Sequence, residues 1–267
     1  SATLVEQSQL VKIPILLTFI SGLAVFSMAL RLRECAPPER HGWSATVRQS
    51  WKQTVVATRW IWMTPLAFGI VLAVMCLDNV IRQFLTLASE YWNVIQLPIA
   101  SYGLIGSGMA LLGLFVPRLA RIMAEKNTAL KNFIISAALV FVGLFGLAYA
   151  VPYWGILPAV LLYVAMGFTN FFVSRYMNEV APSEQRATVL SFRGLTTNFA
   201  YGAVSILYSL LIATIKEGEN LAGFESSDAL QKSVFVESLK WFPWYFLVTV
   251  ALVFVVHRLR FGSRKPG

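Results

Sequence analysis

Apolar runs of about twenty residues recur along the whole chain, and shorter polar segments separate them. A helix rises about 1.5 Å per residue and a bilayer's hydrocarbon core is about 30 Å thick, so each run can cross it. The pattern predicts an all-α integral membrane protein with seven transmembrane helices. We expect these helices at 11–31, 60–87, 97–117, 132–151, 154–176, 189–215 and 241–257.

The longest interruption lies between the first and second spans. Pro37 and Pro38 break any helix there, because proline lacks the backbone N–H that a helix needs. Beyond them an apolar residue recurs every fourth position, at Trp43, Val47, Trp51 and Val55. This stripe predicts a helix that lies on the membrane surface or leads directly into the next span. The pattern therefore divides the chain into three parts: 1–31, which holds one span; 32–59, a connection with a surface helix; and 60–267, which holds six spans.

Composition and charge agree with this pattern. The chain is 57% hydrophobic and only 13% charged, whereas about a quarter of the residues of a soluble domain are charged. A net charge of +9 is typical of a nucleic-acid-binding protein, but the basic residues gather at the ends of the spans. We therefore expect no nucleic-acid partner. Most of them lie in alternate connections. This asymmetry predicts an N-terminus outside and a cytoplasmic C-terminus in a plasma or inner membrane.

Candidate metal ligands and disulfides are sparse. Cys35 and Cys76 have no spacing typical of a disulfide, and His41 and His257 have no clustered cysteines or acids beside them. We expect no metal and no cofactor. The chain begins at Ser1 without methionine or a signal peptide, so we expect it to be a fragment.

Two charges lie inside the second predicted span. Asp78 and Arg82 are one helical turn apart, so they share a face and can form an ion pair. A charge near the bilayer centre costs roughly 2.5 to 3.5 kcal/mol, and such residues commonly serve transport or sensing. One interpretation is that this face, with Asn79, lines a cavity and binds a polar solute or a proton. The other is a structural pair near the outer interface, with Arg82 reaching toward water.

A second polar group lies in the fifth and sixth predicted spans. Asn170 and Arg175 fall near the end of one, and Arg193, Asn198 and Tyr201 lie in the next. Such side chains join helices to each other or contact a ligand. Small residues also recur, with Gly103 four positions before Ser107 and Gly106 four before Ala110. This spacing predicts close helix contacts rather than a phosphate loop, because no Gly-Lys-Ser or Gly-Lys-Thr follows.

Two short motifs carry a resemblance to a known family. The segment at 178–191 contains Pro182 followed by Arg186-Ala187-Thr188 and resembles the Pro-x-x-x-Arg-Ala-Thr segment of many bacterial major facilitator superfamily transporters. The segment from Gly113 to Arg121 resembles that family's Gly-x-x-x-Asp-Arg-x-Gly-Arg pattern, with Pro117 and Ala120 at the acidic and second glycine positions.

The resemblance implies a twelve-helix carrier of which this chain is the sixth helix and the C-terminal half. In such a carrier, 1–31 is the last helix of the N-terminal half, 32–59 is the cytoplasmic linker with its surface helix, and 60–267 is the C-terminal six-helix bundle. It implies a small-molecule substrate, a possible coupling proton, a lipid bilayer and the missing N-terminal half as partners. The substrate or ion candidates are Asp78, Asn79, Arg82, Asn170, Asn198 and Tyr201. The candidates for a cytoplasmic gate are Arg118, Arg121, Arg175, Glu179, Arg186 and Arg193.

Other classes fit the sequence less well. A seven-helix receptor or sensor with its N-terminus outside would have the same topology, and it remains the alternative. No lysine lies in the last span to carry a retinal, and the spans hold neither a second buried acid for an aspartate protease nor a base beside a nucleophilic serine. We therefore expect a secondary transporter and no enzyme.

Overall fold

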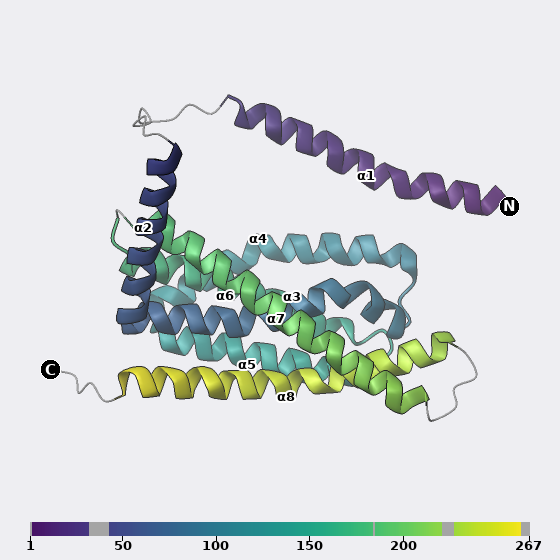
Figure 1. Cartoon of the computed structure of the whole chain (residues 1–267). Coiled ribbons are helices and arrows are strands. Elements are labelled where there is room, and N and C mark those ends of the chain that lie inside the picture. Colours follow the sequence, from purple (N-terminus) through teal and green to yellow (C-terminus); the bar gives the residue numbers. More distant parts are fainter. Residues whose placement is uncertain (1, 32–42, 184, 221–226, 263–267) are drawn as a thin grey trace. The chain divides into compact units, whose positions relative to one another are not determined.

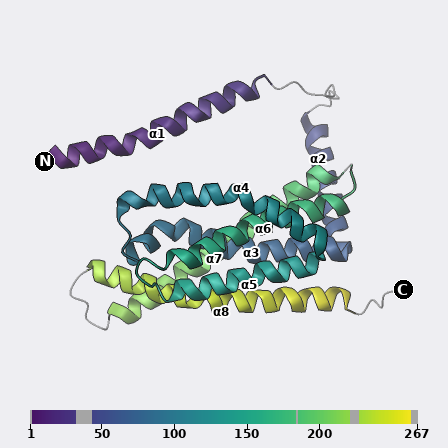
Figure 2. The ribbon, with the colours of Figure 1, turned by 180° about the vertical axis from the view of Figure 1, so that it is seen from behind.

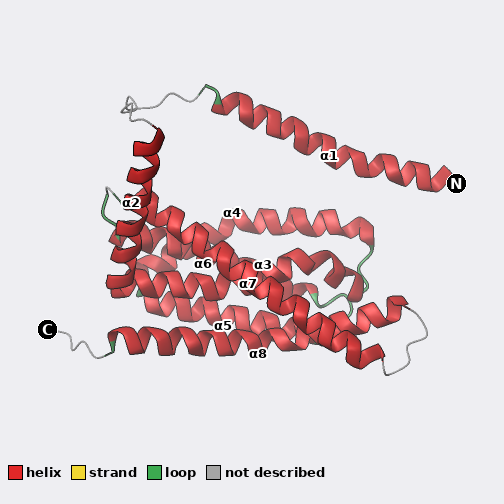
Figure 3. Ribbon diagram, viewed as in Figure 1, coloured by secondary structure: helices red, strands yellow, loops and turns green. Residues whose placement is uncertain are grey.

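The computed structural model describes residues 2–31, 43–183, 185–220 and 227–262 (Figure 1). These residues form helices joined by short connections and include no strand (Figure 3). The helices are α1 Ala2–Ala29, α2 Trp43–Met63, α3 Pro65–Val94, the short 3-10 helix η1 Ile99–Ser101, α4 Tyr102–Lys126, α5 Ala129–Ala148, α6 Ile156–Val180, α7 Arg186–Asn220 and α8 Ser227–Phe261. The chain divides into two units, Ser1–Gln49 and Ser50–Gly267, and the second holds α3 to α8.

Six of the seven predicted spans are confirmed as helices long and apolar enough to cross a membrane, namely α3 to α8. Their surfaces expose large apolar side chains, including Leu104 at 76% and Phe199 at 74%, as expected for a multi-pass membrane protein. The remaining span, predicted at 11–31, falls on α1. Within the described residues, the apolar part of this helix covers only Leu16–Ala29, which is shorter than a membrane span. The span at 11–31 therefore stays a prediction.

The second predicted span, at 60–87, is interrupted near its beginning. α2 ends at Met63, Thr64 is extended, and Pro65 occupies the first turn of α3, where its missing N–H costs nothing. The chain changes direction at this point (Figure 1). α2 is therefore a separate helix: Val47, Trp51 and Val55 are exposed, while Ala57 and Ile61 are buried in the bundle. Residues 32–42 of the predicted linker, with Cys35 and His41, lie outside the described residues.

Several helices extend beyond the predicted spans, among them α4, α7 and α8. α4 continues to Lys126, so Arg118 and Arg121 lie within a helix and not in the connection that follows the predicted span at 97–117. The connection between the predicted spans at 189–215 and 241–257 is helical at both ends, because α7 runs to Asn220 and α8 starts at Ser227. Polar residues exclude these segments from hydrocarbon but do not prevent a helix, so hydropathy made these helices too short.

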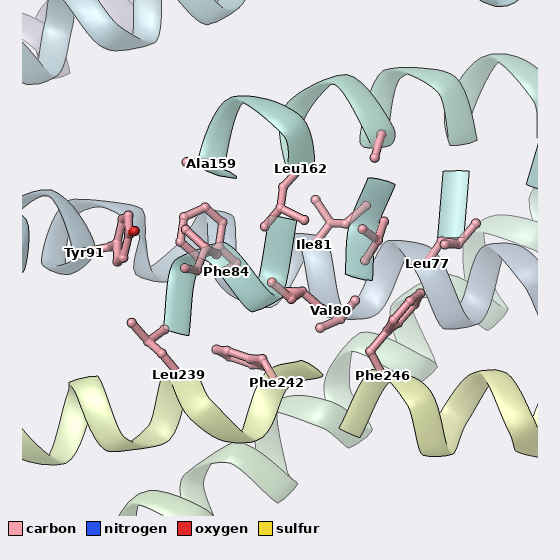
Figure 4. Close-up of a cluster of buried hydrophobic side chains, with 14 of the residues drawn as sticks. Leu77, Val80, Ile81, Phe84, Tyr91, Ala159, Leu162, Leu239, Phe242 and Phe246 are labelled. Carbon is pink, nitrogen blue, oxygen red and sulfur yellow. The ribbon is translucent and has the colours of Figure 1, made fainter. Parts of the chain in front are cut away.

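α3 lies at the centre of the bundle, because α5, α6, α7 and α8 all pack against it. The front and back views show these helices running alongside one another (Figure 2). Apolar side chains of α3, α6 and α8 fill the space between them (Figure 4). The labelled members of this cluster are Leu77, Val80, Ile81, Phe84, Tyr91, Ala159, Leu162, Leu239, Phe242 and Phe246. This packing fixes the rotation of α3 and so determines which of its faces carries the polar residues.

Close helix contacts occur at glycines other than those predicted. A Cβ at Gly143 would lie 2.7 Å from Leu162 Cδ2, and one at Gly146 would lie 2.7 Å from Pro158 Cβ. α5 and α6 therefore approach closely only because these positions lack a side chain. At Gly103 and Gly106 of α4, by contrast, a Cβ would meet nothing within 4 Å in the described structure. The predicted small-residue contact of α4 is thus wrong for the described bundle.

Asn132 joins three helices at one end of the bundle. It is fully buried, and its Nδ2 donates to Tyr176 Oη at 2.7 Å and to the Met123 carbonyl at 3.2 Å. Its Oδ1 accepts from Asn127 Nδ2 at 3.1 Å. Both polar ends of the amide are therefore satisfied, which indicates a structural role in holding α4, α5 and α6 together.

At the opposite end, Tyr91 joins α3 to the α5–α6 connection. Its side chain is fully buried, and the hydroxyl donates to the Gly155 carbonyl at 3.1 Å. We expect Tyr91→Phe to lower the free energy of unfolding by about 1 kcal/mol, because it leaves a buried carbonyl without this donor. Tyr149→Phe, at an exposed position, is the matched control and should leave it unchanged. Thermal unfolding in detergent measures both; equal stability of the two variants would contradict the expectation.

Candidate functional site

Most polar residues in the middle of α3 contact α7, and Asn79 faces α8. Asp78, Asn79 and Gln83 are only 3%, 6% and 4% exposed, and they are the buried polar side chains of this helix. Asp78 lies 13 residues beyond the start of α3 at Pro65, which corresponds to about 20 Å along the axis. The site therefore lies deep within a helix of membrane-spanning length.

Asp78 and Arg82 form the ion pair that their spacing predicts. Asp78 Oδ2 lies 2.5 Å from Arg82 Nη2, with the carboxylate side chain 4% exposed and the arginine side chain 31% exposed. Apart from this pair, Oδ2 has no hydrogen-bond partner among the described residues. The carboxylate is thus enclosed, while the guanidinium reaches the surface of the bundle.

Residues of α7 complete the surroundings of Arg82. Its Nη1 donates to Asn198 Oδ1 at 2.7 Å, and its guanidinium lies over the Tyr201 ring at 5.4 Å from the centroid. The Tyr201 hydroxyl lies 2.9 Å from Thr86 Oγ1, one turn further along α3. The structure therefore brings the two polar groups expected from the sequence together, because α3 and α7 pack side by side.

A second arginine, Arg193, stands beside this cluster. Its Nη2 donates to Asn170 Oδ1 of α6 at 3.3 Å. It is half-buried and lies within electrostatic range of Asp78. Thus α3, α6 and α7 each contribute hydrogen-bonding side chains, which we call the polar cluster: Asp78, Arg82, Thr86, Asn170, Arg193, Asn198 and Tyr201.

Two further residues link α3 to α7 next to the polar cluster. Ser205 Oγ donates to Gln83 Oε1 at 2.9 Å, and Asn79 faces the Tyr245 hydroxyl of α8. Asn79 Oδ1 is buried without a hydrogen-bond partner in the described structure. Asn79 therefore lies behind the ion pair, toward α8, and not with Arg82 on the open side.

Sequence inspection missed Thr86, Gln83 and Ser205. Thr86 could have been found, because positions 78, 82 and 86 repeat every four residues on one helix face. Gln83 and Ser205 carried no such signal. Their pairing depends on how α3 and α7 are rotated against each other, which only the tertiary structure determines.

The gate candidates do not form one group. Arg175 pairs with Glu179 on α6 and Arg121 with Glu125 on α4, each four residues apart. Arg118 is exposed on α4, and Arg186 is the exposed first residue of α7. All ion pairs among the described residues join positions three or four apart on one helix. A gate that pairs separate helices stays a prediction.

A cavity of about 560 Å³ lies on the opposite side of α3 from the polar cluster. It is bounded by α3, α5 and α8, with Leu66, Cys76, Phe133 and Phe254 among its walls and His257 at one end. His257 Nε2 lies 3.2 Å from the Pro65 carbonyl. Because a carbonyl only accepts, this contact requires the proton on Nε2. The lining is apolar and offers no charged group to a polar solute.

Among the described residues, no group of three His, Cys, Asp or Glu side chains lies close enough together to hold one metal ion. Comparison with protein-family models, curated proteins and solved structures gives no match. The function of the protein must therefore be inferred from the depth, charge and exposure of the polar cluster.

Proposed function

We propose that the protein is a secondary transporter resembling those of the major facilitator superfamily, with α3 to α8 as its C-terminal half. One observation carries the proposal. Charged and hydrogen-bonding side chains from α3, α6 and α7 converge at depth within membrane-spanning helices and reach an open side of the bundle. Charged residues inside transmembrane segments cost free energy to insert, and they commonly mark the pathway of a solute or ion.

The exposure of the cluster supports a solute-binding role over simple helix joining. Asn170, Asn198 and Thr86 are exposed in the described bundle, and Arg82 keeps 31% exposure. A structural pair would be enclosed by its neighbours, as Asn132 is. In the proposed carrier this open side faces the N-terminal half, and rocking of one half against the other exposes the site to each membrane face in turn.

The proposal includes an orientation and a location. The basic ends of α4, α6 and α8 lie in the cytoplasm, the C-terminus with them, in a plasma or inner membrane. Arg118, Arg121, Arg175, Glu179, Arg186 and Arg193 then stand near the cytoplasmic ends of their helices, where they can change partners between the two conformations. The transported solute is a small molecule, and the chain has no enzymatic activity.

The test compares cells that produce the native protein with cells that produce Asp78→Asn at the same membrane level. We expect the wild type to move at least one solute of a labelled panel above the vector background, and Asp78→Asn to abolish that flux. The variant keeps the shape of the side chain but removes the charge that holds Arg82. Asp228→Asn, which removes an exposed acid at the start of α8, is the matched control and should transport normally.

Two outcomes would contradict the proposal. One is a wild type that moves no solute of the panel beyond background. The other is a normal flux in Asp78→Asn, which would leave the ion pair as a structural feature only.

A further inference from the structure

The polar cluster holds two arginines but one carboxylate. Asp78 is the only acid within ion-pair distance of Arg82 in the described residues, and none of the ion pairs there includes Arg193. Arg193 instead donates to the neutral amide oxygen of Asn170, and its attraction to Asp78 acts over a longer distance. Two positive charges therefore share one negative charge, and the cluster keeps a net charge of about +1.

The nearby acids do not change this balance. Glu90 lies eight residues beyond Arg82 on α3, about 12 Å along the axis, and interacts electrostatically with Tyr102 and Tyr208. Glu179 of α6 already pairs with Arg175 at 2.5 Å. The excess positive charge thus belongs to Arg82 and Arg193, which are only partly exposed, so water screens it less than a charge on the open surface.

The donors of the two arginines are also incompletely used. A guanidinium carries five N–H groups. Arg82 directs Nη2 to Asp78 and Nη1 to Asn198, and Arg193 directs Nη2 to Asn170. Both side chains are partly exposed, so their remaining N–H groups are available to a ligand. Carboxylate and phosphate groups match this arrangement, because each presents two oxygens to a guanidinium fork.

We infer that the polar cluster binds an anionic solute through a carboxylate or phosphate group held between Arg82 and Arg193. This inference rests on the proposed transport function and specifies its substrate class. Asp78 positions Arg82 and lowers the total positive charge of the cluster, so the anion binds weakly enough to be released. Tyr201, Thr86 and Asn198 supply hydrogen bonds to the uncharged part of the solute. A cationic solute is excluded, because the two guanidiniums would repel it.

The experiment measures binding on the purified native protein in detergent. The thermal unfolding midpoint is recorded against rising concentrations of succinate, inorganic phosphate, glycerol and putrescine, since a ligand that binds the folded state raises the midpoint. We expect succinate or phosphate to raise it in a saturable manner, and glycerol and putrescine to leave it unchanged. The two anions together show whether carboxylate or phosphate is preferred.

Variants link the effect to the cluster. Arg193→Gln should weaken the apparent affinity for the stabilising anion about tenfold, as expected for one charge-assisted hydrogen bond. Arg193→Lys, which keeps the charge but not the fork, should weaken it less. Arg258→Gln, which removes an exposed arginine at the end of α8, is the matched control and should bind as the wild type does. The midpoint of each variant without ligand shows that it is folded.

Stabilisation by putrescine or glycerol, no stabilisation by either anion, or unchanged affinity in Arg193→Gln would overturn the inference. The solute flux of the wild type and its loss in Asp78→Asn are measured separately. A protein that transports a solute but fails the anion test retains its proposed function and loses only the substrate class. A protein without any flux fails at the earlier proposal.

Discussion

Arg82→Gln is expected to destabilise the protein by about 3 kcal/mol, far more than Asp78→Asn does. Removing one partner of a buried ion pair costs roughly 3 to 5 kcal/mol when the other charge is left enclosed, and the partial exposure of Arg82 places it at the lower end. Asp78 is 4% exposed, so without Arg82 its carboxylate has no ion-pair partner and little access to water. Arg82 without Asp78 still donates to Asn198 and is 31% exposed.

The double variant Asp78→Asn/Arg82→Gln separates stability from function. It leaves no unpaired charge at these positions, so it should recover most of the stability lost in Arg82→Gln while remaining inactive in transport. Denaturant unfolding of the purified variants gives the stabilities, and the flux assay gives the activity. Equal losses in the two single variants, or no recovery in the double variant, would show that the two side chains do not act as a buried pair.

Gly146→Ala is expected to lower the free energy of unfolding by about 1 to 3 kcal/mol, the usual cost of adding a methyl group to a packed interface. The new Cβ would lie 2.7 Å from Pro158 Cβ, and a proline ring within a helix cannot rotate away. α5 and α6 would have to separate. Because Gly143 makes a similar contact one turn earlier, the displacement would reach Leu162 as well.

The matched control is Gly106→Ala on α4, where a Cβ meets nothing within 4 Å. Alanine is a better helix former than glycine by about 0.5 to 1 kcal/mol, so this variant should be neutral or slightly more stable. The two substitutions have the same chemistry and opposite expected signs. Thermal unfolding of both in the same detergent measures the difference, and a stable Gly146→Ala would mean that α5 and α6 can separate freely.

The membrane helices could be located from the sequence because long apolar runs report directly on the hydrocarbon they cross. Their ends could not. Asp228 and Lys232 of α8 and Lys126 of α4 are polar but helical, and hydropathy separates lipid from water rather than helix from loop. Pro65 marks the break between α2 and α3, but it lies within the apolar run at 60–87, so the sequence pattern predicts one continuous span there.

The candidate site was predicted in two pieces. The spacing of Asp78 and Arg82 fixes their pairing, because positions four apart share a helix face. Asn198 and Tyr201 were identified only as polar residues of another span. Their contact with Arg82 depends on the packing of α3 against α7 across 116 residues of sequence, and helical periodicity carries no information on it. Gly143 and Gly146 were missed for the same reason.

The ion pair of α3 also matters while the protein is being made. At a synthesis rate of about 5 to 20 residues per second, the 116 residues that separate Arg82 from Asn198 take roughly 6 to 23 seconds to leave the ribosome. During that interval α3 must enter the bilayer without its α7 partner. Because Asp78 and Arg82 lie on the same helix, they can neutralise each other from the moment that turn forms. A pair divided between two helices would leave each charge alone until the second helix arrived.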